Sequence, residues 1–143
     1  MKAVLALFVI VLTLSACCTK KACVENDRIT LQFYGFDTTE LDTVYTTGYA
    51  LGSGFTKVTR EQRLDTTYLG QVDSNRSYYP YYNEGLSDQY EWEVYVPAVN
   101  RTYRFTDYSY STFSCNCPQD KVRSLHGCKM NGIPQNLPVK INK

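Results

Sequence analysis

The sequence predicts an all-β protein, an antiparallel sandwich of about seven strands. Short segments alternate apolar and polar residues, turn signals recur about every ten residues, and no segment keeps a helical period. The chain also contains 13 tyrosines, a residue type that is common in strands. A small barrel is the main alternative, because it produces the same signals. The expected strands are residues 28–34, 43–51, 65–72, 77–82, 90–97, 102–113 and 137–141.

The first two expected strands differ in how clearly they alternate. In residues 28–34, Ile29, Leu31 and Phe33 fall on one face and polar residues fall on the other. Residues 43–51 are instead recognised by their β-prone composition, and Gly52-Ser53-Gly54 after them predicts a hairpin turn. The polar residues 55–64 that follow fit a short helix and an exposed loop equally well.

The middle of the chain contains two further expected strands. Residues 65–72 carry Thr, Tyr, Leu and Val and end at the turn signal Asp73-Ser74-Asn75. Residues 77–82 contain Pro80, which cannot donate a ladder hydrogen bond, so an edge strand or a loop is expected there.

Residues 90–97 form the clearest expected strand. Tyr90, Trp92, Val94 and Val96 alternate with Glu91, Glu93 and Tyr95, and burial of the first set leaves both carboxylates in solvent. Trp92 is the only tryptophan and is predicted to be the centre of the core.

The last third of the chain is predicted to be less regular. In residues 102–113 the aromatic parity changes around Thr106-Asp107, which predicts a bulge or a corner. Residues 114–136 read as loop-rich, and residues 137–141 alternate again as a short C-terminal strand.

The N-terminus carries the marks of a secretory signal peptide over residues 1–16. Lys2 precedes an apolar run over residues 3–12, which is shorter than the roughly 20 residues that a membrane-spanning helix needs. Leu14-Ser15-Ala16-Cys17 follows, and this stretch resembles the lipobox of bacterial lipoproteins. The resemblance implies cleavage before Cys17 and lipidation of Cys17, so that a lipid holds the protein to a membrane. An ordinary cleaved signal peptide is the alternative.

The residues after Cys17 bear on where the protein is anchored. Residues 17–27 are predicted to be a lipidated tether before a β-sandwich domain over residues 28–143. No Asp stands beside the anchor, which in enterobacterial lipoproteins implies the outer membrane, and no acidic cluster marks export to the surface. The expected location is therefore the cell envelope, lipid-anchored in the outer membrane and facing the periplasm.

The whole chain resembles small Bacteroidota envelope lipoproteins with an immunoglobulin-like domain of unknown function. The resemblance rests on the lipobox, on residues 28–34 and 90–97, and on Tyr103-Arg104-Phe105. It implies an immunoglobulin-like sandwich and brings no catalytic residues to this chain.

The charge balance bears on the partners of the chain. Fifteen Lys and Arg face fourteen Asp and Glu, and removal of Lys2 with the signal peptide makes the two numbers equal. A neutral chain does not supply the many phosphate contacts that DNA or RNA binding requires, so no nucleic-acid partner is expected. The expected contacts are the membrane, through the N-terminal lipid, and a protein or glycan partner.

Six cysteines are present, and lipidation of Cys17 leaves five. Because the envelope is oxidising, we predict disulfides among Cys23, Cys115, Cys117 and Cys128. The pairs Cys117–Cys128 and Cys23–Cys115 are expected, because cysteines two apart on an extended segment do not readily pair with each other. Because five is odd, either Cys18 stays free or pairs between chains, or one other thiol is unpaired.

His126 offers an alternative chemistry for the same region. With Cys115, Cys117 and Cys128 it could supply four zinc ligands, or it could act as a general base. Disulfide formation removes the thiol ligands, and His126 beside Gly127 also fits an ordinary loop position. The prediction is therefore no metal, no cofactor and no catalytic residues.

Tyrosines flanking Pro80 form the predicted binding surface: Tyr78, Tyr79, Tyr81 and Tyr82. Exposed rings there would stack on sugars or anchor a protein partner at low entropic cost. The alternative is that Tyr is simply the usual strand residue of this chain. The predicted function is a non-enzymatic, membrane-anchored binding module. A structural or assembly accessory subunit of an outer-membrane complex is the second hypothesis.

Overall fold

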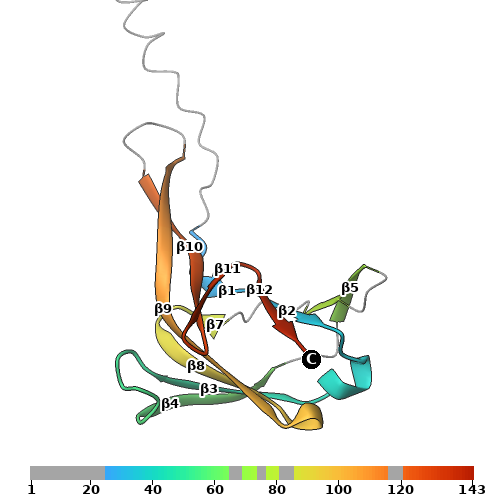
Figure 1. Ribbon diagram of the computed structural model, residues 1–143. Coiled ribbons are helices and arrows are strands. Elements are labelled where there is room, and N and C mark those ends of the chain that lie inside the picture. Colours follow the sequence, from blue (N-terminus) through green and yellow to red (C-terminus); the bar gives the residue numbers. More distant parts are fainter. Residues whose placement is uncertain (1–24, 65–68, 74–76, 81–85, 116–120) are drawn as a thin grey trace, which may run out of the picture.

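The computed structural model describes residues 25–64, 69–73, 77–80, 86–115 and 121–143, and these are mostly β (Figure 1). They form twelve strands in three sheets, with two short 3-10 helices. The elements are β1 (Arg28–Ile29), β2 (Leu31–Tyr34), η1 (Thr38–Leu41), β3 (Val44–Ala50), β4 (Val58–Leu64), β5 (Leu69–Asp73), β6 (Ser77–Pro80), β7 (Leu86–Ser87), β8 (Tyr90–Val96), η2 (Pro97–Val99), β9 (Arg101–Ser114), β10 (Lys121–Met130), β11 (Ile133–Asn136) and β12 (Val139–Asn142). The predicted all-β class is confirmed, and immunoglobulin-like connectivity stays a prediction.

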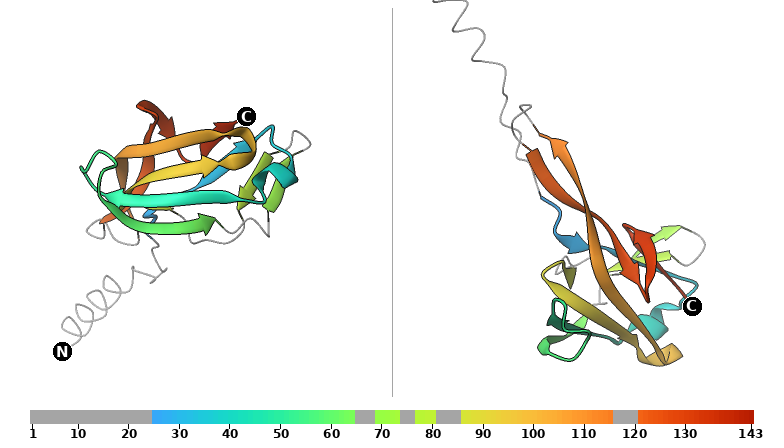
Figure 2. Two further views of the ribbon diagram at one scale, coloured as in Figure 1. Left: turned by 90° about the horizontal axis from the view of Figure 1, so that it is seen from below. Right: turned by 60° about the vertical axis from the view of Figure 1, so that its left-hand side comes forward.

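The largest sheet has six antiparallel strands in the order β11-β10-β9-β8-β3-β4. Figure 2 shows β4, β3, β8 and β9 lying side by side along one side of the molecule. Four of the five pairings join strands that follow one another in the chain, which needs only short connections. Only the pairing of β3 with β8 brings distant segments together.

The second sheet has four strands in the order β12-β2-β6-β5, and a separate pair joins β1 to β7. Val139 lies opposite Leu31 in a parallel pairing of β12 with β2, so the expectation of a wholly antiparallel sandwich is wrong for this pair. The difference arises because β12 follows β11 in the other sheet and crosses to lie alongside β2.

One cluster of buried side chains holds the two larger sheets together. It joins Phe33 and Ile141 of the four-stranded sheet to Trp92 and Phe105 of the six-stranded sheet. Trp92 is only 1% exposed and is the largest of the fully buried side chains, which confirms its predicted place in the core. Its indole N–H donates a hydrogen bond to the Ser87 carbonyl oxygen at 2.7 Å, so burial leaves no unpaired donor.

The region for which the sequence favoured a short helix or a loop, residues 55–64, contains the edge strand β4. β4 pairs with β3 alone, and most of its side chains are exposed. An exposed edge strand needs no apolar face, and its charged residues oppose pairing with another chain. The usual period of two is therefore absent from its sequence.

β6 lies between β2 and β5, so the expectation of an edge strand or a loop around Pro80 is wrong for residues 77–80. Pairing with β2 involves only Ser77 and Tyr78. Pro80 lies past that pairing and opposite Leu69 of β5, so its missing N–H costs no bond to β2.

The loop-rich reading of residues 114–136 is also wrong, because β10 and β11 cover much of this region. Leu125 and Cys128 are both buried although their positions differ in parity. The register shift between Leu125 and Gly127 explains this, because it places one extra residue in β10 and so changes which face the later positions occupy. The second shift, between Gly127 and Lys129, places its extra residue in β9. The bulge predicted near Asp107 is confirmed, because Asp107 has φ of 49° beside one of these shifts.

Candidate functional site

The outward face of the six-stranded sheet carries a row of aromatic side chains. Tyr45 and Tyr49 point outward from β3. The alternate residues of this strand, Val44, Thr46 and Gly48, are buried. Tyr45 lies opposite Tyr95 of β8 in the sheet register, so the two rings belong to neighbouring positions. Tyr45 is 49% exposed, which leaves this end of the row open to solvent.

The turn between β3 and β4 contributes the other end of the row. Phe55 has φ of 64°, a left-handed conformation that is rare for a bulky residue. Its ring lies 5.3 Å from the Tyr49 ring in an edge-to-face contact, and the Arg104 guanidinium lies 4.9 Å from its centroid. We name Tyr45, Tyr49, Phe55, Tyr95 and Arg104 the aromatic strip.

Glu91 holds this turn over the sheet. Its carboxylate accepts hydrogen bonds from the backbone N–H groups of Gly52 at 3.1 Å and Phe55 at 3.4 Å. Glu91 is only 8% exposed, so the prediction that it stays in solvent is wrong. The turn covers the outward face at this point and supplies the donors that a buried carboxylate needs.

The centre of the aromatic strip carries an ion pair. The Arg104 Nε lies 2.9 Å from a Glu93 carboxylate oxygen, and the Arg104 side chain remains 56% exposed. Partial burial, and then the Glu93 carboxylate, raise the pKa of the Tyr49 hydroxyl, which stays protonated at neutral pH. The strip thus presents aromatic rings, a hydroxyl donor and a paired charge. The two carboxylates beside it are both engaged, Glu91 by the turn N–H groups and Glu93 by Arg104.

The predicted tyrosine surface remains a prediction. Tyr78 and Tyr79 belong to β6, whereas Tyr81 and Tyr82 lie outside the described residues. The aromatic strip was missed at the sequence level, although Tyr45, Thr47 and Tyr49 alternate as an outward face should.

The predicted Cys117–Cys128 bridge is wrong, because Cys128 is a free thiol. β10 begins at Lys121, and Cys128 lies seven residues further along this strand, in the core. At roughly 3.3 Å per residue that is about 23 Å along the strand, whereas bridged Cα atoms lie within about 7 Å. An extended strand therefore carries Cys128 away from the end of β10 that is nearer to Cys117 in the sequence.

Cys115 is disulfide-bonded, and no disulfide joins two cysteines of the described residues. Its partner therefore lies outside them, where Cys17, Cys18, Cys23 and Cys117 all fall. The Cys23–Cys115 pair stays a prediction.

The cysteine–histidine set does not come together as ligands where the structure describes it. His126 is exposed on β10 while Cys128, two positions on, is buried in the core. No group of three His, Cys, Asp or Glu residues suited to a metal ion occurs among the described residues. Close packing explains the glycine at position 127 between them, because a Cβ there would lie 2.4 Å from the Gln135 carbonyl oxygen.

We expect Cys128 to resist alkylation while the protein is folded. It is 3% exposed, and burial raises the pKa of its thiol to about 11, so at pH 8 about one molecule in a thousand carries the reactive thiolate. Iodoacetamide labelling of the tryptic peptide 124–129, measured by mass spectrometry, should be at least about 100-fold slower than in denatured protein. Labelling should accelerate as the pH rises towards 11, and rapid labelling of folded protein at pH 8 would contradict this assignment.

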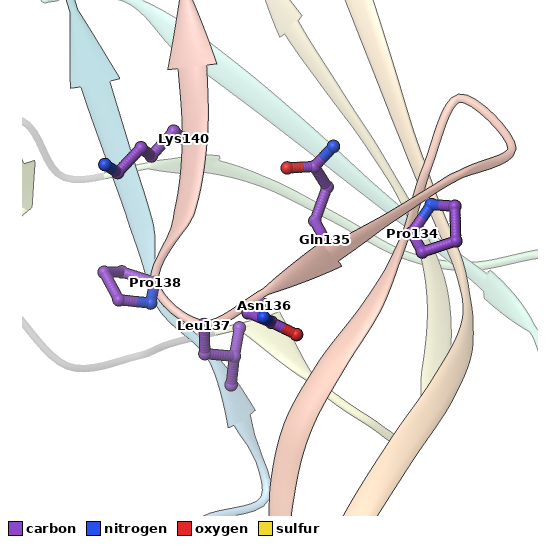
Figure 3. Close-up of a pocket in the computed structure, with 6 residues that line it drawn as sticks. All are labelled: Pro134, Gln135, Asn136, Leu137, Pro138 and Lys140. Carbon is purple, nitrogen blue, oxygen red and sulfur yellow. The ribbon is translucent and has the colours of Figure 1, made fainter.

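A shallow hollow of about 500 Å³ lies along the connection from β11 to β12. Figure 3 shows its lining residues spread along this connection. They are Pro134, Gln135, Asn136, Leu137, Pro138 and Lys140. Lys140 is the only ionisable residue among them.

Comparisons of the chain with protein-family models, curated proteins and solved structures found no match. Within the described parts of the chain, no helix has the length and apolar character required to cross a membrane.

Proposed function

We propose that this chain is a lipid-anchored envelope protein that binds a protein partner through the aromatic strip and carries out no covalent chemistry. Cys17 is the proposed lipidation site, and the periplasmic face of the outer membrane is the proposed location. The motif Leu14-Ser15-Ala16-Cys17 after a short apolar run supports the anchor. The exposed strip on a rigid sheet face is the observation that carries the binding function.

Residue types and rigidity both favour a protein partner. Tyr, Phe and Arg are enriched in protein–protein interfaces, and Tyr and Arg are also enriched among the residues that dominate the binding energy. Tyr45 and Tyr49 stand four residues apart on β3, about 13 Å, which suits an extended contact. Strand positions and the Glu91 hydrogen bonds hold these rings before binding, so little side-chain entropy is lost. A sugar ring would need an open aromatic face, and Arg104 lies over that of Phe55.

The left-handed conformation of Phe55 adds support. Such a conformation costs about 1–2 kcal/mol for a residue other than glycine, and unfavourable backbone is found most often where a side chain must be held for a task. In this protein the left-handed conformation holds the Phe55 ring on the outward face of the sheet, where a turn in solvent would not need it. We therefore place Phe55 in the binding surface.

Site-specific photocrosslinking in cells of the native host tests the proposal. A photoreactive phenylalanine analogue at position 45 should join the chain to one defined protein, because Tyr45 is exposed within the strip. The same analogue at position 133 should not, although Ile133 is 63% exposed on β11. Adding Arg104→Ala should lower the yield at position 45 about tenfold, the usual effect of removing a central arginine.

Arg101→Ala is the matched control, because Arg101 lies on the same strand but bonds weakly towards the Asn142 carbonyl oxygen, away from the strip. Equal crosslinking from positions 45 and 133, or equal loss with the two arginine variants, would contradict the proposal. A glycan-array signal that Tyr45→Ala abolishes would show that the aromatic strip binds a glycan and not a protein.

A further inference from the structure

β9 and β10 run beyond their neighbouring strands and continue as a two-stranded ribbon. β8 pairs only with residues 101–105 of β9, and β11 pairs only with residues 127–130 of β10. We define the ribbon as residues 109–114 and 121–125, which Figures 1 and 2 show projecting from the body of the molecule. A two-stranded ribbon alone is marginally stable in water, so its base needs support.

Side chains at the base attach the ribbon firmly to the fold. The Tyr110 hydroxyl donates a hydrogen bond to the Asp88 carboxylate at 2.9 Å, and the Arg123 guanidinium lies 3.4 Å from the Tyr110 ring centroid. The Leu125 N–H donates to the Asn26 carbonyl oxygen at 2.7 Å. The chain therefore enters the fold at the base of the ribbon, and the direction of the ribbon is fixed relative to that point.

The length of chain before Asn26 limits how far the base can lie from a lipid on Cys17. The two positions are nine residues apart, which corresponds to at most about 30 Å of extended chain. From Leu125 to Lys121 the ribbon extends about 13 Å beyond its base. We call the end of the ribbon at residues 112–114 and 121–123 the ribbon tip. A tether less than fully extended thus allows the ribbon tip to reach the membrane surface.

The chemistry of the tip fits such a surface. Phe113 is 45% exposed, and Lys121 and Arg123 are exposed on the opposite strand. No acidic residue occurs among the described residues of the ribbon, and Asp120 belongs to the connection outside them. Phe113 lies opposite Val122, so Lys121 and Arg123 face the other side of the ribbon. The two faces of this end together offer an aromatic ring and basic side chains, the usual combination for binding at an anionic lipid interface.

We propose that the ribbon tip docks on the anionic headgroups of the membrane that holds Cys17. Phe113 enters the boundary between headgroups and acyl chains, and Lys121 lies beside the lipid phosphates. This inference rests on the lipid anchor of the proposed function. Arg104 lies ten residues from Ser114 along β9, about 33 Å, so docking leaves the aromatic strip away from the membrane and open to a partner.

The test uses the full acylated chain in vesicles of phosphatidylethanolamine and phosphatidylglycerol that contain lipids brominated near the headgroup. With Phe113→Trp, the new indole should lose about half its emission, because an interfacial ring lies within about 10 Å of the bromines. Ile133→Trp on the body of the molecule should not be quenched, and Trp92 contributes the same buried background to both variants.

Reversal of the charge at Lys121 tests whether docking depends on anionic lipids. Lys121→Glu in the Phe113→Trp chain should shift the docked population about fivefold or more towards undocked, since each basic residue near an anionic surface contributes about that factor. Lys57→Glu, at the exposed turn between β3 and β4, is the matched control and should change nothing. Vesicles of neutral phosphatidylcholine should abolish the quenching.

The outcomes separate this inference from the anchor. Intact mass and vesicle co-sedimentation report whether Cys17 is acylated, and a chain without lipid overturns the proposed anchor. An acylated, sedimenting chain in which the indoles at positions 113 and 133 are quenched equally overturns the docking while the anchor stands. Quenching that is unchanged by Lys121→Glu and by neutral lipid also overturns it.

Discussion

Replacement of Trp92 by alanine should lower the free energy of unfolding by about 3–5 kcal/mol, the usual cost of removing a large buried aromatic ring. The side chain is 1% exposed and contacts the Tyr90 ring edge-to-face at 5.6 Å. It also packs against Gly48, where an added Cβ would lie 3.1 Å from the indole. The cavity cannot refill from its neighbours, because these contacts come from rigid strands. Urea unfolding followed by far-ultraviolet circular dichroism measures the loss.

Trp92→Phe separates the two contributions of the indole. It keeps much of the apolar volume but leaves the Ser87 carbonyl oxygen without its donor, so its cost should be clearly smaller than that of Trp92→Ala. Because both variants remove the only tryptophan, circular dichroism is the appropriate probe for both. A loss below about 1 kcal/mol for Trp92→Ala would show that the core is organised around other residues.

Gly127→Ala should destabilise the protein by about 3 kcal/mol, near the upper end of what overpacking costs. The added Cβ would lie 2.4 Å from the backbone carbonyl oxygen of Gln135 and 3.2 Å from the Ser109 hydroxyl oxygen. A backbone oxygen in a paired strand cannot move aside as a side chain can, so β11 must separate from β10. The urea midpoint and hydrogen exchange of the β11 amides together report this separation.

Gly132→Ala is the control in the same hairpin. Nothing lies within 4 Å of its added Cβ, and its φ of 81° leaves only a backbone cost of about 1–2 kcal/mol. It should leave the exchange of β11 amides close to that of the unmodified protein. Equal stability losses with equal exchange in both variants would show that the close approach at Gly127 does not determine the packing of β11.

Local pattern was sufficient for strands that bury one face and expose the other. β8 and β12 were predicted because Trp92, Val94 and Val96, and likewise Val139 and Ile141, recur at the period of a strand. β4 has no buried face to reveal it, and a register shift after Leu125 interrupts the period of β10. The predictions failed where the periodic signal itself was missing or broken.

The candidate site lay beyond local reasoning for a different reason. Tyr45 and Tyr95 are fifty residues apart and become neighbours only because β3 pairs with β8. Glu91 was placed in solvent because its strand position points outward, and the turn that covers it comes from elsewhere in the chain. A period identifies the face of a residue, but not what lies over that face.

The sequence by itself determined the all-β class, the central place of Trp92 and the bulge near Asp107, because each depends on neighbours within one strand. The tertiary structure alone decided the parallel pairing of β12, the burial of Glu91 and the free thiol of Cys128. These depend on which distant segments meet and on how far an extended strand carries a residue from its neighbours in sequence. Such distances are set by the packing of whole sheets, which no short stretch of residues encodes.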